Sequence, residues 1–287
     1  MNNARWYVDQ LLNVQSADKR LGQHFLIDDD LLGRIVDYGE VQDSDHVLEI
    51  GPGPGTLTST LLSRGCKVTA VEIDEGAVHH LNEIFENEIH DGQLSLLNDD
   101  VLKYTFPSSI NKVIANIPYQ ISSPLLEQIT SFHRQHTPLD VVVLLVQEEF
   151  AERLEMKTSD TVGTLGLVTS LDFEVSLFEK VSPDSFIPHP KVYSRIVGLM
   201  PQQIDLPCDR KLLIMVMRHC FYQRRKKLRT LLKTPPKRIN RVNGWYQKRW
   251  IKAYNSLRSD EQLDARPEEF SLEDWVTLIL RFEKHAS

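Results

Sequence analysis

The sequence has few cysteines and no long hydrophobic run. Three of its 287 residues are cysteine, at positions 66, 208 and 220, with no CxxC spacing. This pattern excludes a disulfide framework and gives no zinc signature, so we expect three buried free thiols and no metal site. The sequence contains no run of about 18 apolar residues, and its opening segment lacks the apolar core of a signal peptide. We therefore expect a soluble globular protein located in the cytoplasm.

Acidic residues are missing from one long stretch. Residues 210–252 contain 15 Lys and Arg and no Asp or Glu, although the whole chain has 33 basic and 40 acidic residues and a net charge of −7. Aromatic residues are interleaved with the basic ones. A basic segment of this kind on an acidic body favours a nucleic-acid-binding surface over an ordinary solvated helix face. The pair Trp245 and Trp250 is as compatible with core packing as with a nucleic-acid contact.

Short apolar runs alternate with helix-length segments over the first 200 residues. Strands are predicted at 46–50, 67–73, 93–97, 112–117 and 141–147, with helices at segments such as 56–63 and 76–89. This alternation predicts an α/β fold with a mostly parallel, doubly wound sheet. Segments 173–178 and 192–200 are predicted to add an antiparallel edge hairpin.

The composition changes near residue 201. Beyond Pro201 the sequence is basic and helix-periodic, and it is interrupted by T-P-P-K at 234–237 and A-R-P at 265–267. We predict two domains, an α/β domain over residues 1–200 and a small helical, basic domain over residues 201–287.

Three motifs follow the first three predicted strands. The stretch V-L-E-I-G-P-G-P-G-T-L-T at 47–58 contains Gly51 and Gly53, which have no Cβ to block a ligand from the backbone. Glu72 ends the second strand, where an acid accepts hydrogen bonds from both ribose hydroxyls. Asp100 follows the third strand and is placed to accept a hydrogen bond from an adenine amine, although a lone Asp there is more often a helix N-cap. These features leave NAD, FAD and S-adenosylmethionine as candidate cofactors.

The fourth predicted strand ends in A-N-I-P-Y-Q, residues 115–120. The Asn116 side-chain oxygen and the Ile117 carbonyl, which Pro118 restricts to extended geometry, offer two acceptors for the N–H groups of an exocyclic purine amine. Tyr119 is suited to stack on a flipped base. Such a transfer needs positioning and electrostatics rather than a carboxylate base, because the amine becomes acidic only once methylated. Alone, the tetrapeptide is more typical of a strand ending in an Asn turn with a Pro stop.

Seven motifs occur in order, and together they closely resemble the KsgA-type small-subunit ribosomal RNA adenine dimethyltransferases. They are R-L-G-Q-H-F-L at 20–26, E-I-G-P-G-P-G-T-L-T at 49–58, V-E-I-D at 71–74, D-V-L-K at 100–103, N-I-P-Y-Q-I-S-S-P at 116–124, F-I-P-H-P-K-V-Y-S at 186–194 and F-Y-Q-R-R-K-K-L-R at 221–229. The resemblance implies a Rossmann-like, S-adenosylmethionine-dependent enzyme. It also implies dimethylation of N6 on two adjacent adenines near the 3′ end of small-subunit rRNA, within a pre-ribosomal particle.

The resemblance assigns roles to individual residues. It implies that the cofactor is bound by Gln23, His24, Leu26, Gly51, Gly53, Glu72, Asp100 and Asn116. The implied catalytic set is Asn116, Ile117, Pro118, Tyr119 and Phe186, with Phe186 across the target base from Tyr119; the alternative for Phe186 is a loop aromatic that plugs the core. The implied RNA contacts are Arg224, Arg225, Lys226, Lys227 and Arg229. Asp99 stands where such enzymes commonly have Gly, which leaves the register between Asp99 and Asp100 open.

Three other functions compete with this interpretation. Large-subunit rRNA adenine methyltransferases share the first motifs and N-I-P-Y, but I-S-S-P and the P-H-P-K-V loop resemble the small-subunit group more closely. A ribosome-assembly factor without catalysis, and a Rossmann oxidoreductase, are the remaining alternatives. No obligate protein partner is indicated, and we expect a monomer.

Overall fold

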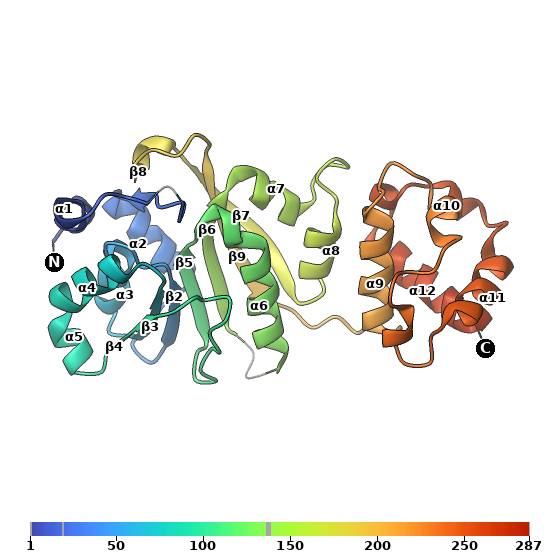
Figure 1. Ribbon diagram of the computed structural model, residues 1–287, viewed down its shortest axis with the longest axis horizontal. Helices are drawn as coiled ribbons and strands as arrows, with labels where there is room; N and C mark the ends of the chain where they lie inside the picture. Colours follow the sequence, from blue (N-terminus) through green and yellow to red (C-terminus); the bar gives the residue numbers. More distant parts are fainter. Residues whose placement is uncertain (1, 19, 136–138, 287) are drawn as a thin grey trace. The chain divides into compact units, whose positions relative to one another are not determined.

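The computed structural model describes residues 2–18, 20–135 and 139–286. The chain divides into two compact units (Figure 1). Unit 1 comprises Met1–Glu152 and Phe173–Gln202, and unit 2 comprises Arg153–Asp172 and Gln203–Ser287. Each unit has its own hydrophobic core.

Unit 1 is built on a seven-stranded sheet with the order β4-β3-β2-β5-β6-β9-β7. Strands β2 to β6 are parallel, whereas β9 pairs antiparallel with both β6 and β7. This arrangement confirms the predicted doubly wound sheet with an antiparallel edge hairpin. The strands are β2 (His46–Ile50), β3 (Lys67–Glu72), β4 (Leu94–Asn98), β5 (Lys112–Asn116), β6 (Val141–Gln147), β7 (Phe173–Val181) and β9 (Ser194–Pro201).

The strand order determines where a ligand can bind. From β2 the chain passes outward to β3 and β4, and then returns to place β5 on the other side of β2. Open α/β sheets bind ligands outside the carboxyl ends of the strands at such a switch point, because the two neighbouring loops leave in opposite directions. The predicted motifs at 49–58, 72, 100 and 116–119 lie at or just after the carboxyl ends of β2, β3, β4 and β5 respectively, so all of them lie at this edge.

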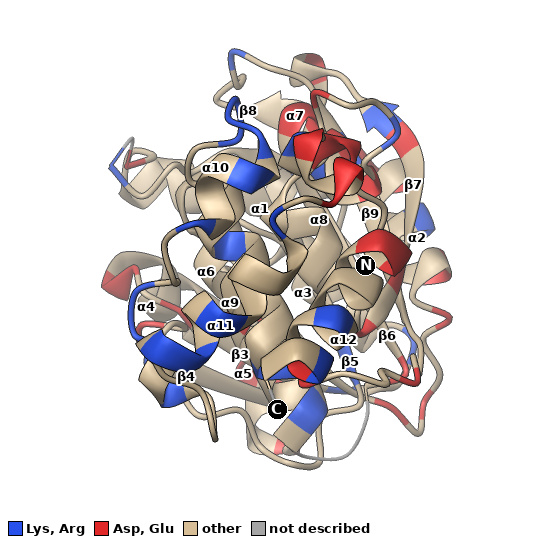
Figure 2. Cartoon of the chain, turned by 90° about the vertical axis from the view of Figure 1, so that its right-hand side faces the viewer, with Lys and Arg blue, Asp and Glu red and all other residues tan. Residues whose placement is uncertain are grey.

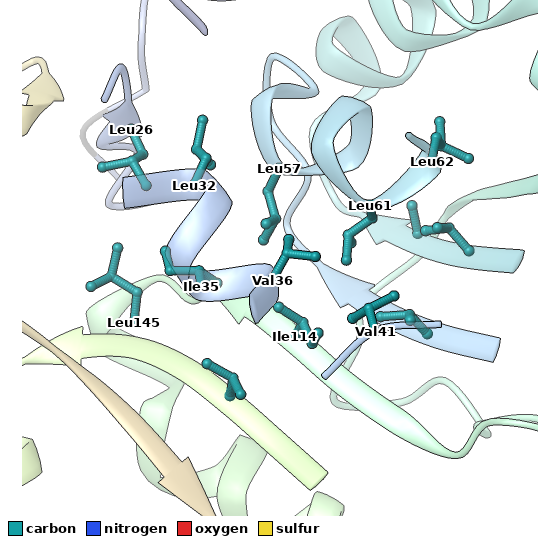
Figure 3. Packing of buried hydrophobic residues seen from close by; sticks show 14 of the residues in the cluster. Leu26, Leu32, Ile35, Val36, Val41, Leu57, Leu61, Leu62, Ile114 and Leu145 are labelled. Atoms are coloured by element: carbon teal, nitrogen blue, oxygen red, sulfur yellow. The ribbon is translucent and has the colours of Figure 1, made fainter. Parts of the chain in front are cut away.

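Helices α2 and α3 cover one face of the sheet. Figure 3 shows Leu32 and Ile35 of α2 and Leu57 of α3 directed toward Ile114 of β5 and Leu145 of β6. All five side chains are at most 4% exposed, so this layer forms the core directly beneath the site. The helices of unit 1 are α1 (Ala4–Val14), α2 (Asp29–Tyr38), α3 (Thr56–Leu62), α4 (Glu75–Ile84), α5 (Glu86–His90), α6 (Ser122–Gln135) and the first part of α7 (Glu148–Glu155).

The observed elements differ from the predicted ones at a few places. The predicted helix 76–89 is two helices, α4 and α5, which meet at Phe85. The short antiparallel pair of β1 (Phe25–Leu26) and β8 (Phe186–Ile187) was not predicted, because strands of two residues have no periodic pattern to detect.

Unit 2 is helical. Its helices are α8 (Thr164–Thr169), α9 (Arg210–Phe221), α10 (Leu228–Leu232), α11 (Gln247–Leu257) and α12 (Leu272–Ala286). Trp250 is fully buried, packs 4.5 Å from Phe282 by ring centroids, and donates a hydrogen bond from Nε1 to the Leu232 carbonyl. Trp245 is also buried, so both tryptophans belong to the core rather than to an RNA-binding surface.

The predicted division at residue 201 missed part of unit 2. Residues 153–172, including α8, belong to unit 2 although they lie in the sequence between strands β6 and β7 of unit 1. Leu167 and Leu171 are buried in the core of unit 2. This segment is too short and too polar to appear as part of a second domain in the sequence, and only its packing shows where it belongs.

The three cysteines are free and buried, as predicted. Within the described ranges, the structure contains no helix that is both long and apolar enough to span a membrane.

Candidate active site

A cleft that is partly open to solvent lies at the carboxyl edge of the sheet of unit 1. Ligands of open α/β sheets bind at this edge. The cleft is lined by Leu32 and Ile35 of α2 and by residues of five segments: 20–26, 49–57, 71–73, 99–101 and 116–121. All the predicted cofactor residues are among them.

The glycine loop after β2 exposes its backbone to the cleft. Gly51 and Gly53 have φ angles of +65° and +55°, which side-chain-bearing residues rarely adopt. The Gly51 N–H donates to the Val71 carbonyl at 2.9 Å. A Cβ at Gly53 would lie 3.1 Å from the ring of Phe25, so any larger residue would press against the 20–26 segment.

Glu72 is a buried carboxylate at the end of β3. It is 5% exposed and accepts hydrogen bonds from the N–H groups of Gly53 at 3.0 Å and Asp74 at 2.9 Å. Burial raises the pKa of Glu72 above its usual value. Each carboxylate oxygen has a second lone pair, so the side chain retains the capacity to accept hydrogen bonds from a ribose diol.

Sequence reasoning missed a second buried acid, Glu49. Glu49 lines the cleft at 1% exposure, and the Thr58 hydroxyl donates to it at 2.7 Å. Burial raises its pKa to about 8. The feature of the sequence that could have indicated a buried acid is the position of Glu49 as the single charged residue within the apolar stretch V-L-E-I.

Asp99 and Asp100 both line the cleft after β4. One oxygen of Asp100 accepts the Leu102 N–H at 3.1 Å, and the other pairs with Lys103 at 3.0 Å. The hydrogen bond with Lys103 lowers the pKa of Asp100. Asp100 therefore caps a local turn while facing the cleft, and the choice between Asp99 and Asp100 as the adenine-binding acid stays a prediction.

The 20–26 segment lies along the cleft and is fixed by hydrogen bonds. Gln23 donates to Asp74 at 2.7 Å and accepts the Asp18 N–H at 2.7 Å. His24 bonds through Nδ1 to the Pro188 carbonyl at 2.7 Å. Leu26 is only 1% exposed and pairs with Phe186 across β1 and β8.

Asn116, the last residue of β5, connects the predicted catalytic tetrapeptide to the 20–26 segment. Its Nδ2 donates to the His24 carbonyl at 3.1 Å, which fixes the amide and leaves Oδ1 as the acceptor of this side chain. Pro118 has extended geometry, with φ −57° and ψ 129°. A Cβ added at Gly51 would lie 3.7 Å from the ring of Pro118, so the tetrapeptide packs on the glycine loop.

Tyr119 is half-buried and its ring stacks near that of His24, with centroids 5.8 Å apart and an interplanar angle of 27°. Its hydroxyl is 2.7 Å from the Ser194 hydroxyl. Burial raises the pKa of the Tyr119 phenol above its usual value.

Phe186 does not line the cleft. It is fully buried in the core of unit 1, because β8 pairs with β1 there. In this position the Phe186 ring exposes no face to a base, and the alternative, a loop aromatic that plugs the core, describes the observed position; the contact with the target base stays a prediction.

The five predicted RNA contacts in unit 2 fall into two groups. Arg224 pairs with Glu268 at 2.9 Å and donates to the carbonyls of Ser159 and Asp160, while Lys227 and Arg229 both pair with Asp264. Arg225 and Lys226 are exposed, and their side chains pair with no described residue. Figure 2 shows further basic residues on α11. Three of the five therefore also hold unit 2 together, a role that the sequence motif did not indicate.

Comparisons with known proteins identify the family. The family model for "Ribosomal RNA adenine dimethylase" matches residues 14–251. The chain belongs to this family. It is therefore an rRNA adenine dimethyltransferase, and the family depends on S-adenosylmethionine.

Three curated relatives from different organisms have similar sequences. A "Ribosomal RNA small subunit methyltransferase A" of Rhodopseudomonas palustris is 40% identical, with 76% of this chain and 78% of the relative covered. A protein with the same name from Flavobacterium johnsoniae is 33% identical over 93% of this chain and 96% of its own length. A "probable" member from Methanopyrus kandleri is 40% identical, with 75% of each chain covered.

Solved structures agree with the family. A dimethyladenosine transferase from Plasmodium falciparum matches with a TM-score of 0.77 and 28% identity, covering 91% of this chain and 98% of that one. The 23S rRNA methyltransferase ErmE matches with a TM-score of 0.64 and 26% identity, covering 90% and 99%.

Proposed function

We propose that this protein dimethylates N6 of two adjacent adenines near the 3′ end of small-subunit rRNA, on a pre-ribosomal particle in the cytoplasm, and that it acts as a monomer. The observation that carries the chemistry is the position of Asn116, whose fixed amide lies in one cleft with the glycine loop and Glu72. The names of the three curated relatives support the small subunit as the target.

The cleft fits S-adenosylmethionine. Gly51 and Gly53 leave bare backbone beside the switch point, and Glu72 provides a buried acid for a ribose diol. Ile73 next to it is 55% exposed and lines the cleft, so it offers an apolar surface to an adenine ring. Asp99 or Asp100 accepts a hydrogen bond from the adenine amine.

The residues around Asn116 prepare the target amine. S-Adenosylmethionine supplies an electrophilic methyl group on a positively charged sulfur. Asn116 Oδ1 and the Ile117 carbonyl accept the two N–H groups of the target N6, which draws its lone pair out of the adenine ring. The ring of Tyr119 stacks on the flipped base, and this contact offsets part of the free energy needed to unstack the base from the RNA.

Unit 2 supplies electrostatic attraction to RNA. Arg225 and Lys226 are exposed and, unlike Lys227, do not pair with an acid among the described residues, and they contact phosphates.

A transfer assay tests the function. Labelled methyl from S-adenosylmethionine is offered to small subunits that lack the modification, to large subunits and to naked rRNA, and the modified base is mapped. We expect label only in small subunits, as N6-dimethyladenosine near the 3′ end. Label on large subunits would favour the activity named for ErmE, and cofactor binding without any transfer would favour an assembly factor.

A further inference from the structure

A buried hydroxyl pair connects the cleft to the antiparallel part of the sheet. Ser194, the first residue of β9, is fully buried, and its Oγ lies 2.7 Å from the Tyr119 hydroxyl. The two residues are 75 positions apart in the sequence. A hydroxyl with no access to water needs a protein partner, and for Ser194 that partner is the tyrosine of the catalytic tetrapeptide.

Ser194 is held firmly by the sheet. It pairs with Gln147 of β6 on one side and with Val181 of β7 on the other. Arg195, the next residue, donates to both oxygens of Glu148, at 2.9 and 2.5 Å, and to the Phe178 carbonyl at 2.8 Å. A bidentate arginine–carboxylate pair fixes geometry as well as contributing stability, so the Ser194 hydroxyl occupies a defined position.

Tyr119 lies in a short turn and not, as Ser194 does, in a strand of the sheet. It begins a single turn of 3-10 helix, Tyr119–Ile121, directly after Pro118. The hydrogen bond at its para oxygen fixes the direction of the ring axis, and the neighbouring His24 ring limits rotation about that axis. Since the Tyr119 hydroxyl is already bonded inside the protein, the ring face is the part of this side chain available to a base.

We propose that Ser194 is a positioning residue that holds the ring of Tyr119 in the orientation required for stacking on the target adenine. This inference rests on the proposed function. Ser194 acts through Tyr119 and does not touch the substrate. Stacking geometry controls how closely the target N6 approaches the methyl donor, and small misplacements are costly in rate.

A double-mutant cycle tests the inference. S194A, Y119F and the double variant are compared with the wild type by kcat and KM for methyl transfer to unmodified small subunits, by cofactor affinity in calorimetry, and by unfolding in urea. We expect S194A and Y119F each to lower kcat by about three- to tenfold, the effect of one lost hydrogen bond, with cofactor affinity within about twofold of wild type. S194A in the Y119F background should cause no further loss of kcat.

The chain offers a matched control. Tyr7 and Ser59 form a second buried tyrosine–serine pair in unit 1, with their hydroxyls 2.8 Å apart. S59A removes the same kind of bond and should lower stability to a similar extent while leaving kcat unchanged. S194T keeps a hydroxyl at position 194 and should recover part of the lost rate.

Each outcome has a definite meaning. Independent, multiplicative losses in kcat, or S194A as active as the wild type, would overturn the positioning role. Non-additivity in unfolding without any change in kcat would also overturn it, because the bond would then be only structural. A wild-type protein that transfers no methyl would refute the proposed function, and the inference with it, and this result is distinct from an active wild type that is insensitive to S194A.

Discussion

The predicted functional residues of unit 1 and of unit 2 are held in different ways. In the cleft of unit 1, Asn116 and Glu72 each bond to backbone groups of a neighbouring segment, so the site is fixed before any ligand arrives. In unit 2, Arg225 and Lys226 are exposed. The difference suits their tasks, because methyl transfer requires atoms in fixed positions, whereas phosphate attraction depends on charge and tolerates motion.

The strongest test of this difference is removal of the fixed amide. Asn116→Ala should reduce methyl transfer by about 100- to 1000-fold, the usual effect of deleting one preorganised polar group at a reacting centre, while cofactor binding persists. Single-turnover transfer and calorimetry measure the two effects.

The opposite end of β5 provides the control for this variant. Asn111 precedes the strand and bonds to Asp45 and Asp140. Asn111→Ala should lower stability but leave transfer unchanged. Retained activity in Asn116→Ala would contradict the proposed role of the amide.

A smaller effect is expected from the ribose acid. Glu72→Gln keeps the shape of the side chain but replaces a charged acceptor with a neutral one, and hydrogen bonds to charged groups are stronger by about 1 kcal/mol or more. We expect cofactor affinity to fall about tenfold in a binding titration. Glu83→Gln, at a side chain that is 69% exposed on α4, is the control and should bind normally. Equal affinities for Glu72→Gln and the wild type would show that the acid does not contact the cofactor.

Exposed and paired basic residues of unit 2 should respond differently to replacement. Replacing Arg225 and Lys226 with Ala should weaken binding to small subunits a few-fold and lower the slope of log affinity against log salt by about 1.5, with no change in stability. Arg224→Ala should instead destabilise unit 2 by about 1 kcal/mol, because it loses Glu268 and the 159–160 carbonyls. Salt titrations and urea unfolding separate the two. If Arg224→Ala changes only RNA binding, the division into structural and exposed residues is wrong.

The last prediction concerns the pH dependence of the stability of unit 1. Glu49 has a folded pKa of about 8, against a usual 4.5. The unfolded chain therefore loses this proton at lower pH than the folded chain, and stability falls as pH rises from about 4.5 to about 8. Glu49→Gln should reduce this loss. Urea unfolding at pH 6 and pH 8 measures it, and a variant with the same pH dependence as the wild type would contradict the assignment.

The sequence allowed the central sheet and most of the cleft to be predicted, since the parallel strands are mainly apolar and β2 to β5 each end at a functional motif. At the level of single residues it was less informative. Phe186 and Arg224 stand in motifs that suggest substrate contact, but the β1–β8 pair buries the first and Glu268 pairs with the second. Both partners are distant in the chain, so no local pattern could indicate them.

The amino-acid sequence by itself determined the positions of the strands, the cofactor motifs and the tetrapeptide. These depend on local periodicity and on residues placed at strand ends. Only the tertiary structure decided that residues 153–172 belong to unit 2, that Glu49 is a buried acid, and that Ser194 holds Tyr119. The physical reason is that burial and hydrogen-bond partners are properties of segments brought together by folding, which neighbours along the chain do not specify.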